Sequence, residues 1–205
     1  AAGGAGGGEG GGEGGAVAVG GGGGASASGH AIAACMCAER VALLDLATGE
    51  VVGTVQDKLA EEVQEPVTAF VVHPRRREIV TAHRSGMLRH WSIDVEGGKR
   101  EVLNEWKGAH SSPVLCMAYD PTGTLVATGG ADRIVMVWDV ERGYATHHFR
   151  GHDAIVTHLH FHPDPKKLML VSCSEDTTVR LWALRETGKK QSVATLTNHY
   201  SPVTG

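Results

Sequence analysis

The feature that most constrains this chain is a repeat that begins near His30. Tryptophans recur at intervals of 47 and 44 residues: Trp91, Trp138 and Trp182. Histidines that stand four residues before a valine recur at His110, His152 and His199. A unit of about 40 to 45 residues with a Gly-His start and a Trp-Asp end is typical of one four-stranded blade of a β-propeller.

The pattern inside one unit, residues 110–150, predicts four short strands. These runs are rich in β-branched and aromatic residues, and turn residues separate them: PVLCMAYD, TLVATGG, IVMVWDV and ATHHFR. Residues 67–106 and 152–197 show the same order, residues 30–56 supply three strands, and residues 198–205 begin a fifth unit. We therefore expect an all-β fold of about four propeller blades, as a fragment of a larger propeller.

Residues 1–29 have a different character. Sixteen of the chain's 29 glycines lie there, and the rest are mainly alanine, serine, valine and glutamate. Such a segment cannot bury enough apolar surface to offset the loss of backbone entropy on folding. We expect a disordered glycine-rich tail ahead of the blades.

The overall charge excludes some broad classes of partner. The chain has 19 basic and 23 acidic side chains and a formal net charge of -4, so nothing draws it as a whole to nucleic acid or to an anionic membrane. No apolar run approaches the roughly 18 residues of a membrane span. Binding to a polyanion must therefore be local.

Polar residues recur at fixed places in two of the units. A histidine before the first strand can bond an aspartate in the turn between the second and third strands, while a hydroxyl and a tryptophan complete a buried network. The residues at these places are His110, Thr128, Asp132 and Trp138, and then His152, Ser172, Asp176 and Trp182. A catalytic triad needs one convergent geometry rather than copies at blade spacing. We interpret both sets as structural and expect no catalytic residues.

The unit over residues 67–106 departs from this pattern. Thr81 and Trp91 remain, but Ser85 stands at the aspartate position and Val63 at the histidine position. We expect this blade to be held mainly by apolar packing.

A second group of histidines raises the question of a metal. His158, His160 and His162 alternate along one predicted strand, with His147 and His148 nearby. Neither an acidic residue nor a cysteine stands at a suitable spacing for zinc, and no pair of the four cysteines has the C-x-x-C spacing. We expect no metal and no cofactor.

Basic residues concentrate in two sets of loops. In a propeller, the loops between first and second strands and between third and fourth strands emerge on one face. We expect a broken basic arc there that contacts RNA phosphates or an acidic protein segment. Its members are Arg75, Arg76, Arg77, Lys99, Arg100, Lys166, Lys167, Lys189 and Lys190.

Over residues 30–205 the chain resembles WD40 repeat proteins, although the Trp-Asp dipeptide itself is present only at Trp138 and Asp139. The stretches ATGGADRIVMVWDVERGYATHHFRGH, FHPDPKKLMLVS and LTNHYSPVT are similar to the transducin-beta-like WD40 family of the small-subunit processome, in its UTP-B subcomplex. The glycine tract and the missing helical C-terminal region depart from that family.

This resemblance implies a non-enzymatic scaffold in the nucleolus that takes part in pre-rRNA processing and small-subunit biogenesis. The implied partners are other WD40 subunits of the processome, a small nucleolar RNP and pre-rRNA, with no membrane and no small-molecule substrate. The alternative is a WD40 adaptor of another class, such as a ubiquitin-ligase substrate receptor or a signalling scaffold.

Overall fold

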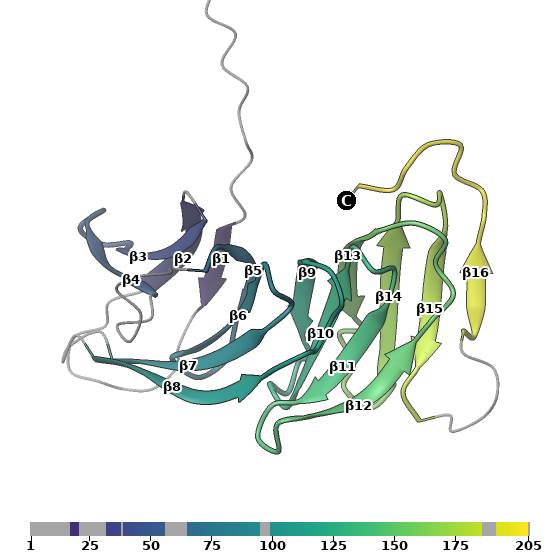
Figure 1. The fold of residues 1–205 in the computed structure, drawn as a ribbon. Coiled ribbons are helices and arrows are strands. Elements are labelled where there is room, and N and C mark those ends of the chain that lie inside the picture. Colours follow the sequence, from purple (N-terminus) through teal and green to yellow (C-terminus); the bar gives the residue numbers. More distant parts are fainter. Residues whose placement is uncertain are drawn as a thin grey trace, which may run out of the picture.

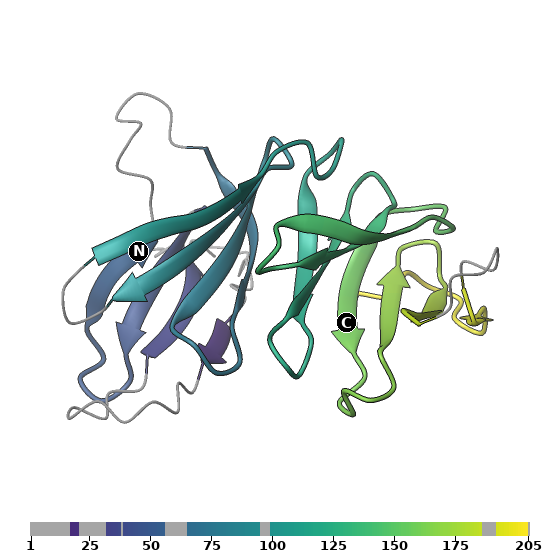
Figure 2. The same ribbon diagram turned by 90° about the horizontal axis from the view of Figure 1, so that it is seen from below.

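The fold consists of four antiparallel sheets of four strands each, which stand side by side in an arc (Figure 1). The view from below shows the same succession from the N-terminal to the C-terminal sheet (Figure 2). This all-β architecture confirms the predicted propeller blades. The computed structural model describes residues 17–20, 32–37, 39–55, 65–94, 99–185 and 192–204.

Each sheet is one blade, with strands a to d in chain order. Blade one holds β1 (Val17–Gly20), β2 (Ile32–Cys37), β3 (Arg40–Asp45) and β4 (Val51–Val55). Blade two holds β5 (Val67–Val72), β6 (Glu78–His83), β7 (Leu88–Asp94) and β8 (Lys99–Trp106). Blade three holds β9 (Val114–Tyr119), β10 (Leu125–Gly130), β11 (Val135–Asp139) and β12 (Tyr144–Phe149). Blade four holds β13 (Val156–Phe161), β14 (Met169–Ser174), β15 (Val179–Ala183) and β16 (Ala194–Leu196).

Strand β1 lies inside the glycine-rich tract, where we expected no strand. It pairs with β2 from Val17 opposite Cys35 to Gly20 opposite Ile32, so blade one has four strands instead of three. Val17 and Val19 are the only β-branched residues of the tract. The free edge of β2 offers backbone groups that need partners, and this demand arises only once the blade has formed. The remainder of the predicted tail lies outside the described residues.

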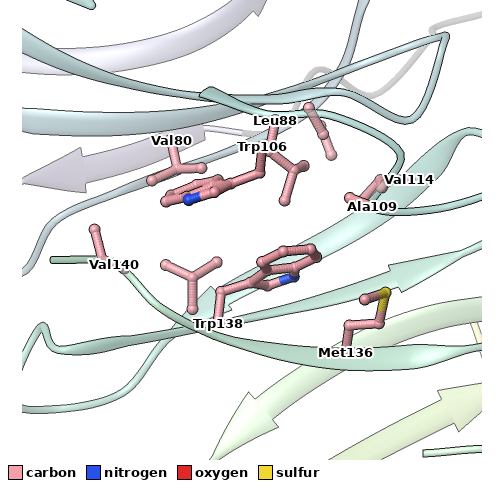
Figure 3. Close-up of a cluster of buried hydrophobic side chains, with 11 residues drawn as sticks. Val80, Leu88, Trp106, Ala109, Val114, Met136, Trp138 and Val140 are labelled. Carbon is pink, nitrogen blue, oxygen red and sulfur yellow. The ribbon is translucent and has the colours of Figure 1, made fainter. Parts of the chain in front are cut away.

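The apolar core lies between consecutive blades. Figure 3 shows the layer between blades two and three, where Val80, Leu88 and Trp106 of blade two face Met136 and Trp138 of blade three. Similar clusters join blade one to blade two and blade three to blade four. A single sheet would leave one such face in water, so each blade depends on its neighbour for stability.

Trp106, which falls outside the 44–47-residue series, has a counterpart in the next blade. Its ring stacks on Trp138 with centroids 5.8 Å apart, and Phe149 stacks on Trp182 with centroids 4.8 Å apart. Both Trp106 and Phe149 end a strand d, opposite the first residue of strand c. The aromatic residue that ends one blade therefore covers the repeated tryptophan of the next, as Figure 3 shows for Trp106 and Trp138.

The C-terminal residues return from β16 toward the inner strands of blade four (Figure 1). The Val203 N–H donates to the Ser174 carbonyl at 3.2 Å, and the Thr157 hydroxyl donates to the Val203 carbonyl. In the same way, the Val67 N–H of blade two donates to the Glu39 carbonyl of blade one at 2.9 Å. Val203 therefore occupies the place that Val67 has at the start of strand a.

Candidate functional site

The polar network of blade three brings together four residues from four segments of the blade. His110, in the loop before β9, places Nδ1 3.0 Å from each carboxylate oxygen of Asp132 and Nε2 2.8 Å from the Thr128 hydroxyl. The Trp138 indole N–H donates to the same hydroxyl at 3.0 Å. The geometry fits a tautomer in which Nδ1–H donates to the Asp132 carboxylate and Nε2 accepts the Thr128 hydroxyl proton. Each polar side-chain group of the network has a partner.

Blade four repeats this geometry with a serine. His152 Nδ1 lies 2.8 Å from Asp176 Oδ2 and Nε2 lies 2.7 Å from the Ser172 hydroxyl, which accepts the Trp182 N–H at 2.8 Å. Burial lowers the pKa of His152, and the bond to Asp176 offsets only part of that effect. Burial alone would raise the pKa of Asp176, but hydrogen bonds from Thr178, the Asp153 N–H and His152 hold it well below its usual range.

The two networks keep their hydroxyls away from solvent. Thr128 and Ser172 are both 0% exposed. Each hydroxyl is also engaged by an indole N–H on one side and an imidazole on the other. The same arrangement in successive blades is the mark of a repeated scaffold element.

Blade two has a polar network too, beside the apolar packing that we expected to hold it. The Trp91 N–H donates to the Thr81 hydroxyl at 2.8 Å, and His83 Nε2 lies 3.1 Å from that hydroxyl. The imidazole thus comes from the end of strand b, and not from the loop before strand a. On the other side of the ring, Nδ1 lies 3.4 Å from the Glu65 carbonyl.

The carboxylate of blade two has changed places as well. In blades three and four, the aspartate of the b–c turn accepts a loop N–H, from Ser111 and Asp153 respectively. In blade two the loop residue Glu65 accepts the N–H of Ser85 in the b–c turn. The sequence does contain a signal for this network. Glu65 lies two residues after Val63, at the failed histidine position, and His83 lies two residues before Ser85, at the failed aspartate position.

The expected basic arc is only partly free to bind a partner. Arg75, Arg77, Lys166 and Lys167 are exposed in the a–b loops of blades two and four. Lys99 begins β8, but its side chain is not among those described, and Lys189 and Lys190 lie outside the described residues.

Two of the predicted arginines contact neighbouring blades. The Arg76 guanidinium lies 3.3 Å from Glu141 in the c–d loop of blade three and 3.9 Å from Glu78. The Arg100 guanidinium lies against Gly53 of blade one, where a Cβ atom would come within 1.6 Å of Nη2, and that nitrogen donates to the Val52 carbonyl at 3.4 Å. Arg100 therefore joins blades one and two, and does not extend an open arc.

Two of the alternating histidines, His158 and His160, lie on the sheet face of blade four that points away from blade three, whereas His162 follows β13 and its Nδ1 accepts the Asp164 N–H at 3.0 Å. His158 and His160 are exposed, whereas Leu159 between them is buried in the core that blades three and four share. His147 is engaged elsewhere, with Nε2 3.0 Å from the Leu184 carbonyl. Among the described residues, no group of three or more histidine, cysteine, aspartate or glutamate side chains is placed to hold a metal ion.

Within the same residues, no helix has the length and apolar character to cross a membrane.

Comparison with known proteins bears on both the fold and the family. The chain matches the family described as "WD domain, G-beta repeat" over residues 101–139 and 143–183. Each match begins in strand d of one blade and ends with strand c of the next, β8 to β11 and β12 to β15. One sequence repeat thus spans two blades, which ties neighbours together covalently.

Several relatives cover most of the chain. Transducin beta-like protein 3 of Bos taurus is 46% identical over 170 residues, and that of Homo sapiens is 44% identical over 170 residues. In both cases the match covers 83% of this chain and 20% of the relative, so the chain spans about a fifth of the length of these proteins. Nuclear distribution protein PAC1 of Komagataella phaffii is 30% identical over 135 residues, which cover 58% of this chain and 26% of that protein.

Proposed function

We propose, on the premise that this chain carries WD40 repeats, that it acts as a non-enzymatic scaffold in assembly of the small-subunit processome. In this role it takes part in pre-rRNA processing and small-subunit biogenesis in the nucleolus. The observation that carries the proposal is the 46% identity to Transducin beta-like protein 3 of Bos taurus across 83% of the chain. The partners are other WD40 subunits, a small nucleolar RNP and pre-rRNA.

The distribution of polar groups supports a scaffold. The histidine, hydroxyl and aspartate groups of the networks in blades three and four are engaged within the blades. The exposed cations Arg75, Arg77, Lys166 and Lys167 lie in the loops at the ends of the strands. A rigid sandwich of blades that presents variable loops is suited to binding several partners at once.

Direct contact with RNA phosphates is the finer part of the proposal. The candidates are the exposed side chains Arg75, Arg77, Lys166 and Lys167. A contact made by such cations weakens as the salt concentration rises, because bound counterions are released from the RNA. Arg76 contributes less, because Glu141 and Glu78 already compete for its guanidinium.

Affinity purification of the tagged full-length protein tests the role. We expect recovery of nucleolar WD40 proteins, small nucleolar RNA and pre-rRNA. Recovery of ubiquitin-ligase subunits or signalling enzymes in their place would contradict the proposal and favour a WD40 adaptor of another class.

Crosslinking to RNA in the same cells tests the finer part. Reversal of charge at Arg75, Arg77, Lys166 and Lys167 is expected to reduce crosslinking while the nucleolar proteins are still recovered. Unchanged crosslinking in the folded variant would show that these four side chains are only solvated loop charges.

A further inference from the structure

We propose that three cations around the loop into blade three form a docking surface for an acidic peptide segment of a partner protein. These residues, Arg84, Lys107 and Arg133, are here called the blade-three cation cluster. They lie in b–c turns and in the d–a loop, at the opposite end of the strands from Arg75 and Lys166. The proposal does not depend on the processome role, because it rests on the geometry of this face alone.

Contacts between the loops bring the cluster together. Gly86 in the b–c turn of blade two lies so close to His110 that a Cβ atom there would be 2.3 Å from the His110 carbonyl oxygen. The next residue in that loop, Ser111, donates its N–H to Asp132 at 3.1 Å. Arg84 is two residues before Gly86, Lys107 is three residues before His110, and Arg133 directly follows Asp132. One continuous set of contacts therefore supports all three side chains.

The three cations are exposed and have no acidic partner in the part of the chain that the structure describes. Nearby carboxylates are engaged elsewhere. Asp132 is bonded to His110 and to the Ser111 N–H, Glu65 accepts the Ser85 N–H beside Arg84, and Glu105 lies 2.9 Å from the Arg89 guanidinium. The three cations therefore outnumber the two carboxylates beside them, Glu65 and Asp132, on a chain whose net charge is -4.

The same face of blade four is more acidic, although Arg150 in its d–a loop is also exposed. Asp153 stands where blade three has Ser111, Glu175 stands where it has Ala131, and both carboxylates are exposed. A negatively charged segment is thus attracted to blades two and three and repelled from blade four. This difference sets where, and in which direction, the segment lies.

Blade two contains an internal example of the proposed contact. There the carboxylate of Glu65, one residue before the proline that leads into strand a, accepts the Ser85 N–H of the b–c turn. At the matching place blade three has Ser112, and the matching Asp132 N–H has no partner among the described residues. A glutamate or aspartate of a partner can accept that N–H while its neighbours pair with the arginines.

The composition of the loops favours a peptide over RNA. The turn 84–87, the loop 107–113 and the turn 131–134 contain no phenylalanine, tyrosine or tryptophan. Single-stranded nucleic acid is usually held by stacking of its bases on such side chains as well as by charge. A carboxylate-rich segment needs only the cations and the free N–H.

The test uses the full chain and a fluorescein-labelled peptide of alternating glutamate and serine, with binding followed by fluorescence anisotropy. We expect the triple variant Arg84→Glu, Lys107→Glu, Arg133→Glu to bind on the order of tenfold more weakly, and binding by the unaltered chain to weaken as salt rises. The matched control, Arg75→Glu, Arg77→Glu, Lys166→Glu, removes three exposed cations from the other face and is expected to lower affinity for the peptide less than the triple variant does. Equal losses in the two variants, or no binding by the unaltered chain, would overturn the proposal.

A second variant separates charge from folding. Arg133 has a φ of 67°, where glycine is at ease, so Arg133→Gly removes one cation without straining the turn. We expect weaker peptide binding together with an unfolding temperature at least as high as that of the unaltered chain. Tighter binding of single-stranded RNA of equal charge, lost in the same triple variant, would identify the cluster as an RNA surface and refute the peptide.

Discussion

Blades two and three contain the same central hydrogen bond, from an indole N–H to a buried threonine hydroxyl. The groups that surround this bond come from different segments of the chain in the two blades. In blade three the imidazole comes from the loop before strand a and the carboxylate from the b–c turn. In blade two the imidazole of His83 comes from strand b and faces the Glu65 backbone carbonyl, while the Glu65 carboxylate in the loop accepts the Ser85 N–H of the turn. The two blades thus reach similar hydrogen bonding with the two sources exchanged.

The comparison shows that the buried polar groups need a hydrogen-bond partner at a given point in space, and that different segments of the chain can supply it. A buried hydroxyl and a buried indole N–H each cost about 1–3 kcal/mol if left without a partner. Any residue that reaches the same point can satisfy them, whichever segment carries it. A blade that looks degenerate in its repeat pattern is therefore not necessarily a blade without a network.

Replacement of the central hydroxyl is expected to have the largest effect. Thr128→Val leaves the Trp138 N–H and the His110 ring without their partner, and Thr81→Val does the same to Trp91 and His83. We expect each change to lower the free energy of unfolding by about 3 kcal/mol, measured by urea unfolding. A loss in blade three with a near-neutral result in blade two would restore apolar packing as the support of blade two. The exposed Thr124→Val is the control.

Substitution of the b–c turn residue is expected to lower the stability of blades three and four more than that of blade two. Asp132→Ala and Asp176→Ala leave a buried histidine without its partner and are each expected to cost about 1–3 kcal/mol. Ser85→Ala removes only an exposed hydroxyl that accepts the Met87 N–H at 3.3 Å, so the expected cost is below about 0.5 kcal/mol. Thermal unfolding of the three variants checks this order, and equal shifts would contradict it.

Acid is expected to weaken blade four by a smaller amount. Burial lowers the pKa of His152, so the unfolded chain takes up a proton near pH 6.5 while the folded blade resists it. The stability that the neutral ring contributes is therefore present above pH 6.5 and is lost as the pH falls toward the lowered pKa. His73 and His90 in blade two shift in the same direction, also through burial. Urea midpoints at pH 7.5 and pH 5.5 are expected to differ less in His152→Asn than in the unaltered chain; an unchanged difference would exclude His152 as a source.

The smallest expected effect is a gain in stability at the b–c turns. Thr177 and Arg133 each have a φ of 67°, and Gly86 takes the same place in blade two with a φ of 80°. A β-branched residue is strained in this region, so Thr177→Gly is expected to stabilise the fold by about 0.5 kcal/mol, and Arg133→Gly by less. Differential scanning calorimetry measures both. Destabilisation by Thr177→Gly would show that its side chain contributes contacts that outweigh the strain.

The sequence by itself determined the blades and two of the three networks. Strand alternation and the 44–47-residue spacing are local patterns, and they place the b, c and d strands of every blade without knowledge of what lies across from them. The sets around His110 and His152 follow from the same periodicity, because each member occupies a fixed place within the repeat. The family likeness rests on those same residues.

Only the tertiary structure decided which side chains fill the places where the repeat fails. The pairing of β1 with β2, the exchange of sources at His83 and Glu65, and the packing of Arg100 against Gly53 all join segments whose spacing follows no period. The physical reason is that a buried donor, a free strand edge or a gap beside a glycine is defined by what the folded neighbours leave unsatisfied. These unpaired groups and gaps exist only after the blades have stacked, so no sequence pattern within a single repeat can predict which residues fill them.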